Sequence, residues 1–247
     1  KVEFDNLKNK ERYTAFSYDT INFLHTSQEN NLVLSPIEVI QAVVNRLIGV
    51  EIIDQKENYC IIKEMGEITD KEFDNALRRI FLLLLSLSEE ILKSIKERDK
   101  GDFLKSVCLY DNNIDRFTDF CLRVLNKKGY KDFRKTPSIY STLFILEMVG
   151  DELKKIAIHL MEAKQTTKHV ENLFKIQYDQ LRRYYNLFYG FNKEKILEIY
   201  SEDKKGHAQD ILLFASLNND EKEILHHLKK TGIYLTSLTE LRLDMEH

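Results

Sequence analysis

Hydrophobic residues recur at helical spacing through most of the chain, beginning near residue 70. In the first stretch, 70–97, apolar side chains fall three or four positions apart and therefore share one face of a helix. These positions are Phe73, Leu77, Ile80, Phe81, Leu84, Leu87 and Ile91. The same spacing predicts further helices over 102–126, 137–163, 167–188, 193–217 and 219 to the end.

The predicted helices have similar lengths and fall into two groups of three, which indicates an internal duplication. Antiparallel bundles are the natural packing for consecutive long helices joined by short loops. We therefore predict a mainly α fold with two tandem three-helix bundles, over 68–165 and 166–247. Thr136 is expected to cap the third helix, because a threonine hydroxyl can accept a bond from a free helical N–H.

Residues 1–67 follow a different pattern and predict a small α/β module. Two short strands are expected first, at 13–16 and 20–24. Ser35 then marks the start of an amphipathic helix, and Gly49 closes it. Two β-branched runs flank a polar turn and predict a hairpin, over 50–53 and 59–62.

The composition places the chain among folded soluble proteins, since 43% of residues are hydrophobic and 31% are charged. The net charge of −3 carries no overall basic signature for nucleic acid. The longest apolar run, 80–85, is too short to span a bilayer, so no membrane insertion is expected. No CxxC spacing occurs, and we expect reduced, buried cysteines in a cytoplasmic protein: Cys60, Cys108 and Cys121. Because the sequence begins with Lys1 rather than Met, we expect an upstream segment to be missing.

Two pairs of acidic residues interrupt the apolar stripes of the second and third predicted helices. Asp111 and Asp115 form one pair, and Glu147 and Asp151 form the other. The spacing of four places both carboxylates of a pair on one helical face, where they repel each other unless something neutralises them. In an antiparallel hairpin the two pairs fall at the same height. Gly150, between the acids of the second pair, would permit a close approach.

Three interpretations of these four carboxylates remain open. Oxygen ligands of this kind suit Mg, Ca or Mn, and also iron in carboxylate-bridged clusters. In that case the metal ligands are Asp111, Asp115, Glu147 and Asp151. Internal ion pairs are the second interpretation, with cations from Arg78, Arg79 or Arg116. Plain solvation of an acidic face is the third.

Histidines and known catalytic motifs add little to this picture. His226 and His227 are adjacent, so they point in different directions and are expected on the surface. His159 lies two turns after Asp151 and is a remote candidate ligand. No Glu-x-x-His motif accompanies the acids, which argues against a ferritin-like di-iron oxidase. The sequence also lacks GxxxxGK[ST], GxGxxG and GxSxG, so we expect no enzymatic activity.

These acidic pairs are also where the chain resembles a known family. Residues 146–157, LEMVGDELKKIA, resemble the L-E-x-x-G-D-x-x-x-x-I-A element of PhoU proteins. Residues 44–62 are similar to the region that precedes the PhoU domain in archaeal PhoU-like regulators, and 78–83 resembles their first helix. The resemblance covers most of residues 30–163 and, more weakly, the remainder.

The resemblance implies a regulator that restrains phosphate uptake and its signalling through contacts with phosphate transporter or signalling proteins. It also implies iron or zinc clusters at the acidic pairs. Such regulators often carry an AbrB-like DNA-binding domain at the N-terminus, and we expect most or all of that domain to be missing from this sequence. DNA contact is therefore expected only through that missing domain. We further expect a cytoplasmic homodimer.

The second group of helices departs from the family pattern. It carries other residues at the four acidic positions: Ser201, Lys205, Lys229 and Ile233. We therefore expect no second metal cluster. The leading hypothesis is a phosphate-signalling regulator with a metal site in the first bundle. The alternatives are a metal-free helical dimerisation domain of a transcription regulator and a carboxylate metalloenzyme.

Overall fold

The computed structural model describes most of the chain, which divides into two compact units, Lys1–Ile68 and Thr69–His247. The described residues are 2–3, 36–56, 59–66, 68–97, 102–163, 167–197, 199–201 and 217–246.

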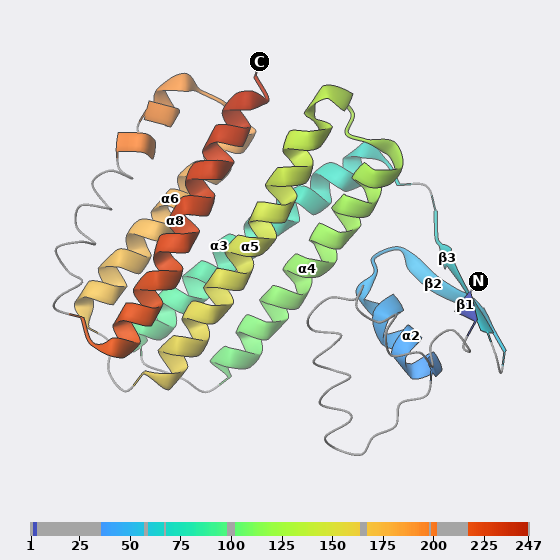
Figure 1. The fold of residues 1–247 in the computed structure, drawn as a ribbon, viewed down its shortest axis with the longest axis horizontal. Coiled ribbons are helices and arrows are strands. Elements are labelled where there is room, and N and C mark those ends of the chain that lie inside the picture. The colour runs from blue at the N-terminus through green and yellow to red at the C-terminus, as the bar shows by residue number, and fades with distance from the viewer. Residues whose placement is uncertain are drawn as a thin grey trace. The chain divides into compact units, whose positions relative to one another are not determined.

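In its described residues, the N-terminal unit consists of a small antiparallel sheet and one helix (Figure 1). The predicted helix and hairpin are confirmed as α2 (Pro36–Arg46), β2 (Val50–Gln55) and β3 (Tyr59–Glu64). The two-residue strand β1 (Val2–Glu3), too short to leave a sequence pattern, pairs with β3 and gives the order β1-β3-β2. The two strands expected between residues 13 and 24 lie outside the described residues.

A compact apolar core holds this unit together. Ile40 and Val44 of α2 pack against Val50 and Cys60 of the hairpin, and all four are buried. Gly49 adopts a φ of 74° in the turn between α2 and β2, a conformation that glycine tolerates best. The sheet and its helix therefore form around the residues that the sequence pattern indicated.

The second unit is built from long helices, and their described boundaries lie within three residues of the predicted ones. They are α3 (Asp70–Glu97), α4 (Phe103–Lys128), α5 (Thr136–Glu162), α6 (Lys168–Tyr189) and α8 (Asn219–Asp244). Residues 193–197 and 199–201 are also helical. No helix in the described part of the chain has a stretch of sufficient length and hydropathy to cross a membrane.

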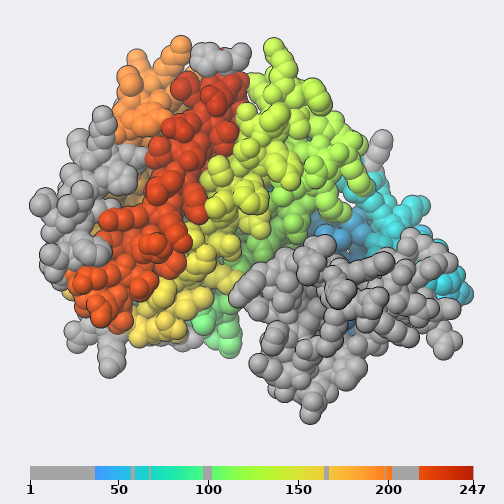
Figure 2. Space-filling model, viewed as in Figure 1, coloured from blue at the N-terminus to red at the C-terminus, as the bar shows by residue number. Residues whose placement is uncertain are grey.

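The helices of the two predicted groups pack on one another. α3, α4 and α5 contact each other, while α8 lies along α5 and α6, and α6 lies along α3. Figure 2 shows α8 and α5 side by side on one face of this unit. The mainly helical fold is therefore confirmed. The division into two three-helix bundles stays a prediction.

An aromatic cluster joins α3 to α6. The buried ring of Phe81 lies 5.0–5.8 Å, between ring centres, from four rings of α6: Tyr184, Tyr185, Phe188 and Tyr189. Tilted and edge-on ring pairs at such distances contribute about 0.5–1.5 kcal/mol beyond simple burial. This cluster fixes the C-terminal end of α6 against the first half of α3.

Two local expectations were wrong. Thr136 does not cap α5, because the short 3₁₀ helix η3 (Phe133–Lys135) leads directly into it and Thr136 is already helical. Its hydroxyl instead accepts a hydrogen bond from the Tyr130 N–H at 2.9 Å. Cys108 is exposed, whereas Cys60 and Cys121 are buried as expected. Cys108 follows Val107, whose side chain takes the inward position on α4.

A capping box begins α8 and ties it to α6. The Asn218 side chain accepts from the Glu221 N–H at 2.9 Å, and the Glu221 carboxylate accepts from the Asn218 N–H at 3.0 Å. Glu221 also accepts from the N–H of Thr167, the residue before α6, at 2.7 Å. Burial would raise the pKa of Glu221, but the hydrogen bonds from Thr167 and Asn218 outweigh it and hold the pKa below its ordinary value. One buried carboxylate thus serves the starts of two helices.

We predict that Asn218→Ala lowers the free energy of unfolding by about 1 kcal/mol, the typical cost of losing an N-cap. Urea denaturation followed by circular dichroism would measure this loss. Glu223→Ala is the matched control, since Glu223 is an exposed acid in the first turns of the same helix. Equal stability of the two variants would contradict the capping role.

Candidate functional site

The acidic pairs predicted from the sequence lie on facing segments of α4 and α5. Asp111 is buried, Asp115 and Glu147 are half-buried, and Asp151 is exposed. A Cβ placed on Gly150 would lie 3.4 Å from Ile114, so the backbone of α5 runs close to α4 at this level. The contact shows that the two acidic segments sit at the same height, as the antiparallel geometry requires.

A lysine, which was not among the cations expected from the sequence, pairs with the buried acid. Lys154 Nζ of α5 donates to the Asp111 carboxylate at 2.6 Å, and only 5% of the Asp111 side chain is exposed. Lys154 lies one turn after Asp151 and two turns after Glu147, so it belongs to the same face of α5. That spacing is visible in the sequence, although only arginines were expected as the neutralising cations.

The four carboxylates do not converge into a ligand set in this structure. Within the described ranges, no group of three or more His, Cys, Asp or Glu side chains is arranged to hold a metal ion. Metal coordination would require Asp111 to exchange its bond with Lys154 for a bond to the ion. The arrangement favours the ion-pair interpretation of Asp111, and metal binding stays a prediction.

A second polar cluster, missed from the sequence, lies between α5 and α8. Glu152 is buried, and the ring nitrogen Nδ1 of His227 lies 2.5 Å from its carboxylate. Lys155 Nζ donates to the same carboxylate at 2.9 Å, and Lys230 Nζ lies 3.9 Å away. The His159 ring stacks on His227 with 5.2 Å between ring centres.

The burial of His227 corrects the expectation that both adjacent histidines lie on the surface. His226 is exposed, but His227 is only 8% exposed. The reason is the packing of α8 along α5, which turns one face of α8 inward. A signal was present in the sequence, because His227 follows Ile224 by three positions and precedes Thr231 by four, and both are buried.

Burial and hydrogen bonding shift the pKa of His227, and likewise the pKa of Glu152, in opposite directions. Burial lowers the pKa of His227, and the bond to Glu152 opposes this without reversing it. Burial would raise the pKa of Glu152, yet the bonds from Lys155 and His227 outweigh it and lower the pKa. The His227 ring and the Glu152 carboxylate are therefore joined by a hydrogen bond while the pKa of each lies below its ordinary value. The other titratable groups that act on the cluster are Lys230, His159, His226 and Tyr234.

The helical unit of this chain has the fold of the PhoU proteins among solved structures. Among solved structures, the phosphate transport system regulatory protein PhoU from Streptococcus pneumoniae matches with a TM-score of 0.60 and 19% identity, over 72% of this chain and 94% of that one. PhoU from Pseudomonas aeruginosa matches with a TM-score of 0.56 and 17% identity, over 70% and 94% of the two chains. No protein-family model and no curated protein sequence matches this chain. The likeness establishes the fold that the sequence resemblance predicted.

We predict that His227 makes the protein less stable on the acid side of neutrality. Because the pKa of His227 is lowered in the fold, the unfolded chain binds a proton first as the pH falls through the ordinary value of 6.5. The contribution of His227 to the free energy of unfolding is complete above pH 6.5 and is lost as the pH falls below it. Thermal unfolding of native chain and His227→Gln, measured between pH 8 and pH 5, should show a smaller loss in the variant.

The control for this measurement is His226→Gln, which removes the exposed neighbouring histidine. This variant should lose as much thermal stability between pH 8 and pH 5 as the native chain does. If His226→Gln and His227→Gln gave the same pH profile, the assignment to the buried ring would be wrong.

We also predict that Lys154→Gln lowers the free energy of unfolding by about 1–3 kcal/mol, because Asp111 is left buried with a weaker partner. Chemical denaturation at pH 7 would measure the change. Lys105→Gln breaks a surface pair with Asp102, whose side chains are 83% and 87% exposed, and should have little effect. An equally small effect of Lys154→Gln would show that the buried pair is not needed for stability.

Proposed function

We propose that this chain is a non-enzymatic regulator of phosphate transport that acts by contacting a partner protein. The observation that carries the proposal is the likeness of its fold to two PhoU proteins, one of them described as a phosphate transport system regulatory protein. The 146–157 segment adds to it, because the residues that resemble the PhoU element lie on α5, at the seam with α4. The proposed setting is the cytoplasm, with the protein as a homodimer.

Exposed apolar side chains on α5 support a role in protein contacts. Tyr140 and Phe144 are one turn apart on the same helical face, with 40% and 54% of each residue exposed. Phe133, just before α5, is 78% exposed. Exposed aromatic residues grouped in this way are typical of surfaces that bind another protein.

We predict that deleting the gene for this chain in its own organism raises phosphate uptake when phosphate is plentiful, since the family resemblance implies a restraining role. Uptake of radiolabelled phosphate would measure the effect. The native gene should restore normal uptake, whereas a Tyr140→Ser/Phe144→Ser gene should not. Leu197→Ser, which alters an exposed apolar residue outside α5, is the matched control and should restore uptake. Unchanged uptake in the deletion strain would contradict the proposal.

A metal ion at Asp111, Asp115, Glu147 and Asp151 is a separate part of the proposal. Its support is the placement of four carboxylates at one level of facing helices, together with the resemblance to proteins that hold iron or zinc there. The Asp111–Lys154 pair instead favours the metal-free alternative, a helical dimerisation domain of a transcription regulator. The two candidates differ in one expectation: only the first requires the protein to bind a metal ion and to gain thermal stability from it.

If the metal proposal is right, the purified chain reconstituted with iron, zinc or manganese should retain stoichiometric metal after desalting. Its melting temperature should rise, and chelator should reverse the rise. Asp111→Asn/Glu147→Gln should abolish both effects, because two candidate ligands lose their charge. Elemental analysis and thermal unfolding would measure them. No retained metal and no change with chelator would overturn the metal site and leave the metal-free adaptor.

A further inference from the structure

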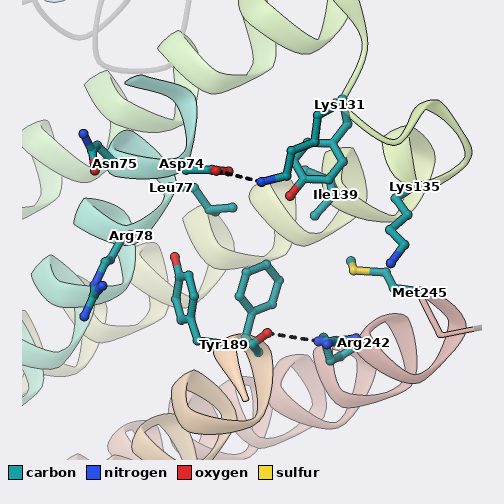
Figure 3. Close-up of a pocket in the computed structure, with 12 residues that line it drawn as sticks. Asp74, Asn75, Leu77, Arg78, Lys131, Lys135, Ile139, Tyr189, Arg242 and Met245 are labelled. Carbon is teal, nitrogen blue, oxygen red and sulfur yellow. Dashed lines mark hydrogen bonds and ion pairs between the residues drawn. The ribbon is translucent and has the colours of Figure 1, made fainter. Parts of the chain in front are cut away.

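A pocket opens where α3 begins and where α6 and α8 end (Figure 3). The connection between α4 and α5 closes another side, through Tyr130, Lys131 and Lys135. The pocket volume is about 330 Å³, at the lower end of the roughly 300–1,000 Å³ typical of small-molecule sites. The residues that line the pocket come from segments far apart in the sequence and from both groups of helices.

Cationic side chains outnumber acidic ones in the lining of the pocket, although the chain as a whole carries a net charge of −3. Its lining holds four cationic side chains and a single carboxylate, Asp74. The cations approach from different sides of the space, as Figure 3 shows: Arg78, Lys131, Lys135 and Arg242. Cations gathered around one concave surface raise the local concentration of anions.

Two of these cations already serve the fold. Arg242 Nε donates to the Phe188 carbonyl at 3.1 Å and so neutralises the C-terminal end of α6. Lys131 Nζ lies 2.7 Å from Asp74. Asp74 would compete with an incoming anion for Lys131. We therefore assign the main anion contacts to Arg78 and Lys135, with Lys131 shared between ligand and Asp74.

Arg78 and Lys135 are placed to receive an anion. The guanidinium carbon of Arg78 lies 5.6 Å from the centre of the Tyr189 ring, a cation–π contact that leaves the in-plane N–H groups able to donate. Lys135 immediately precedes α5, whose N-terminal end carries partial positive charge. Neither cation's charge is cancelled by a carboxylate lining the pocket, since Asp74 is the one acid there and it bonds Lys131.

The size and charge of the pocket together select the ligand class. A volume of about 330 Å³ is some ten times the roughly 30 Å³ that one water occupies in the liquid, which is room for more than one tetrahedral group. A phosphoryl group brings about 1.5–2 negative charges and three strong acceptor oxygens. Linked phosphoryl groups match several cations spread around one space better than a single carboxylate does.

We propose that this pocket binds a small anion carrying two or more linked phosphoryl groups, held by Arg78, Lys131 and Lys135. The ligand bridges the start of α3, the α4–α5 connection and the end of α6, so it would stabilise the packing of the two groups of helices. This binding site does not depend on the proposed role in phosphate transport. Inorganic pyrophosphate and the phosphate chain of a nucleotide are the two sources of this chemistry.

Isothermal titration calorimetry on the purified chain, at fixed ionic strength, tests the proposal with pyrophosphate, tripolyphosphate, ATP, phosphate and sulfate as probes. Pyrophosphate or tripolyphosphate should bind at least tenfold more tightly than phosphate or sulfate. ATP binding more tightly than tripolyphosphate would identify a nucleotide as the source. Equal binding would assign the site to the phosphate chain alone.

Charge variants then locate the site. Arg78→Gln and Lys135→Gln should each weaken binding about tenfold, the loss expected for one charge-assisted contact of about 1.4 kcal/mol. Asp74→Asn should tighten binding several-fold, because it removes the competing carboxylate and frees Lys131. A gain of affinity cannot come from a variant that merely folds poorly.

Arg134→Gln is the matched control. Arg134 lies one residue from Lys135, carries the same charge and pairs with Asp132 outside the pocket lining. It should leave the affinity unchanged within twofold. Equal weakening by Arg134→Gln and Lys135→Gln, or sulfate binding as tightly as pyrophosphate, would mean a diffuse charge effect and overturn the site. Weaker or unchanged binding by Asp74→Asn would overturn it as well.

Discussion

The structure of the helical unit depends on the burial of long apolar stripes between its helices. α5 is central to this packing, because it contacts α3, α4 and α8. Residues along α5 such as Leu143, Leu146 and Ile156 are completely buried. A helix enclosed on several sides has little surface on which a charged group can reach water. Every acid buried in the seams around α5 therefore needs a cation or a hydrogen-bond donor beside it.

Two sites meet that requirement in different ways. Across the α4–α5 seam, Asp111 is matched by Lys154. Across the α5–α8 seam, Glu152 is matched by Lys155 from its own helix and by His227 from α8. The second arrangement couples the packing of two helices to a histidine whose pKa is lowered by burial. The stability of the helical unit thus depends on the ion pairs and hydrogen bonds that neutralise the acids buried between its helices.

The proposed functions follow from what this packing leaves on the surface. The exposed rings of Tyr140 and Phe144 lie on the outer face of α5, where a partner protein has access. The basic pocket forms where helices from both groups end together. A phosphorylated ligand in that pocket would act on the packing of the groups, and the packing in turn places the α5 surface.

The sequence by itself determined the positions of the helices, because a period of 3.6 residues is a local property that each segment carries alone. It also placed the two acidic segments at one height, since an antiparallel hairpin leaves little freedom in register. Only the tertiary structure decided that Lys154 reaches Asp111, that His227 rather than His226 turns inward, and that Arg78 and Lys135 share a pocket. These outcomes depend on the rotation and offset of each helix against its neighbours. Those quantities are set by the packing of the whole unit, because many side chains must fit at once, and no single segment encodes them.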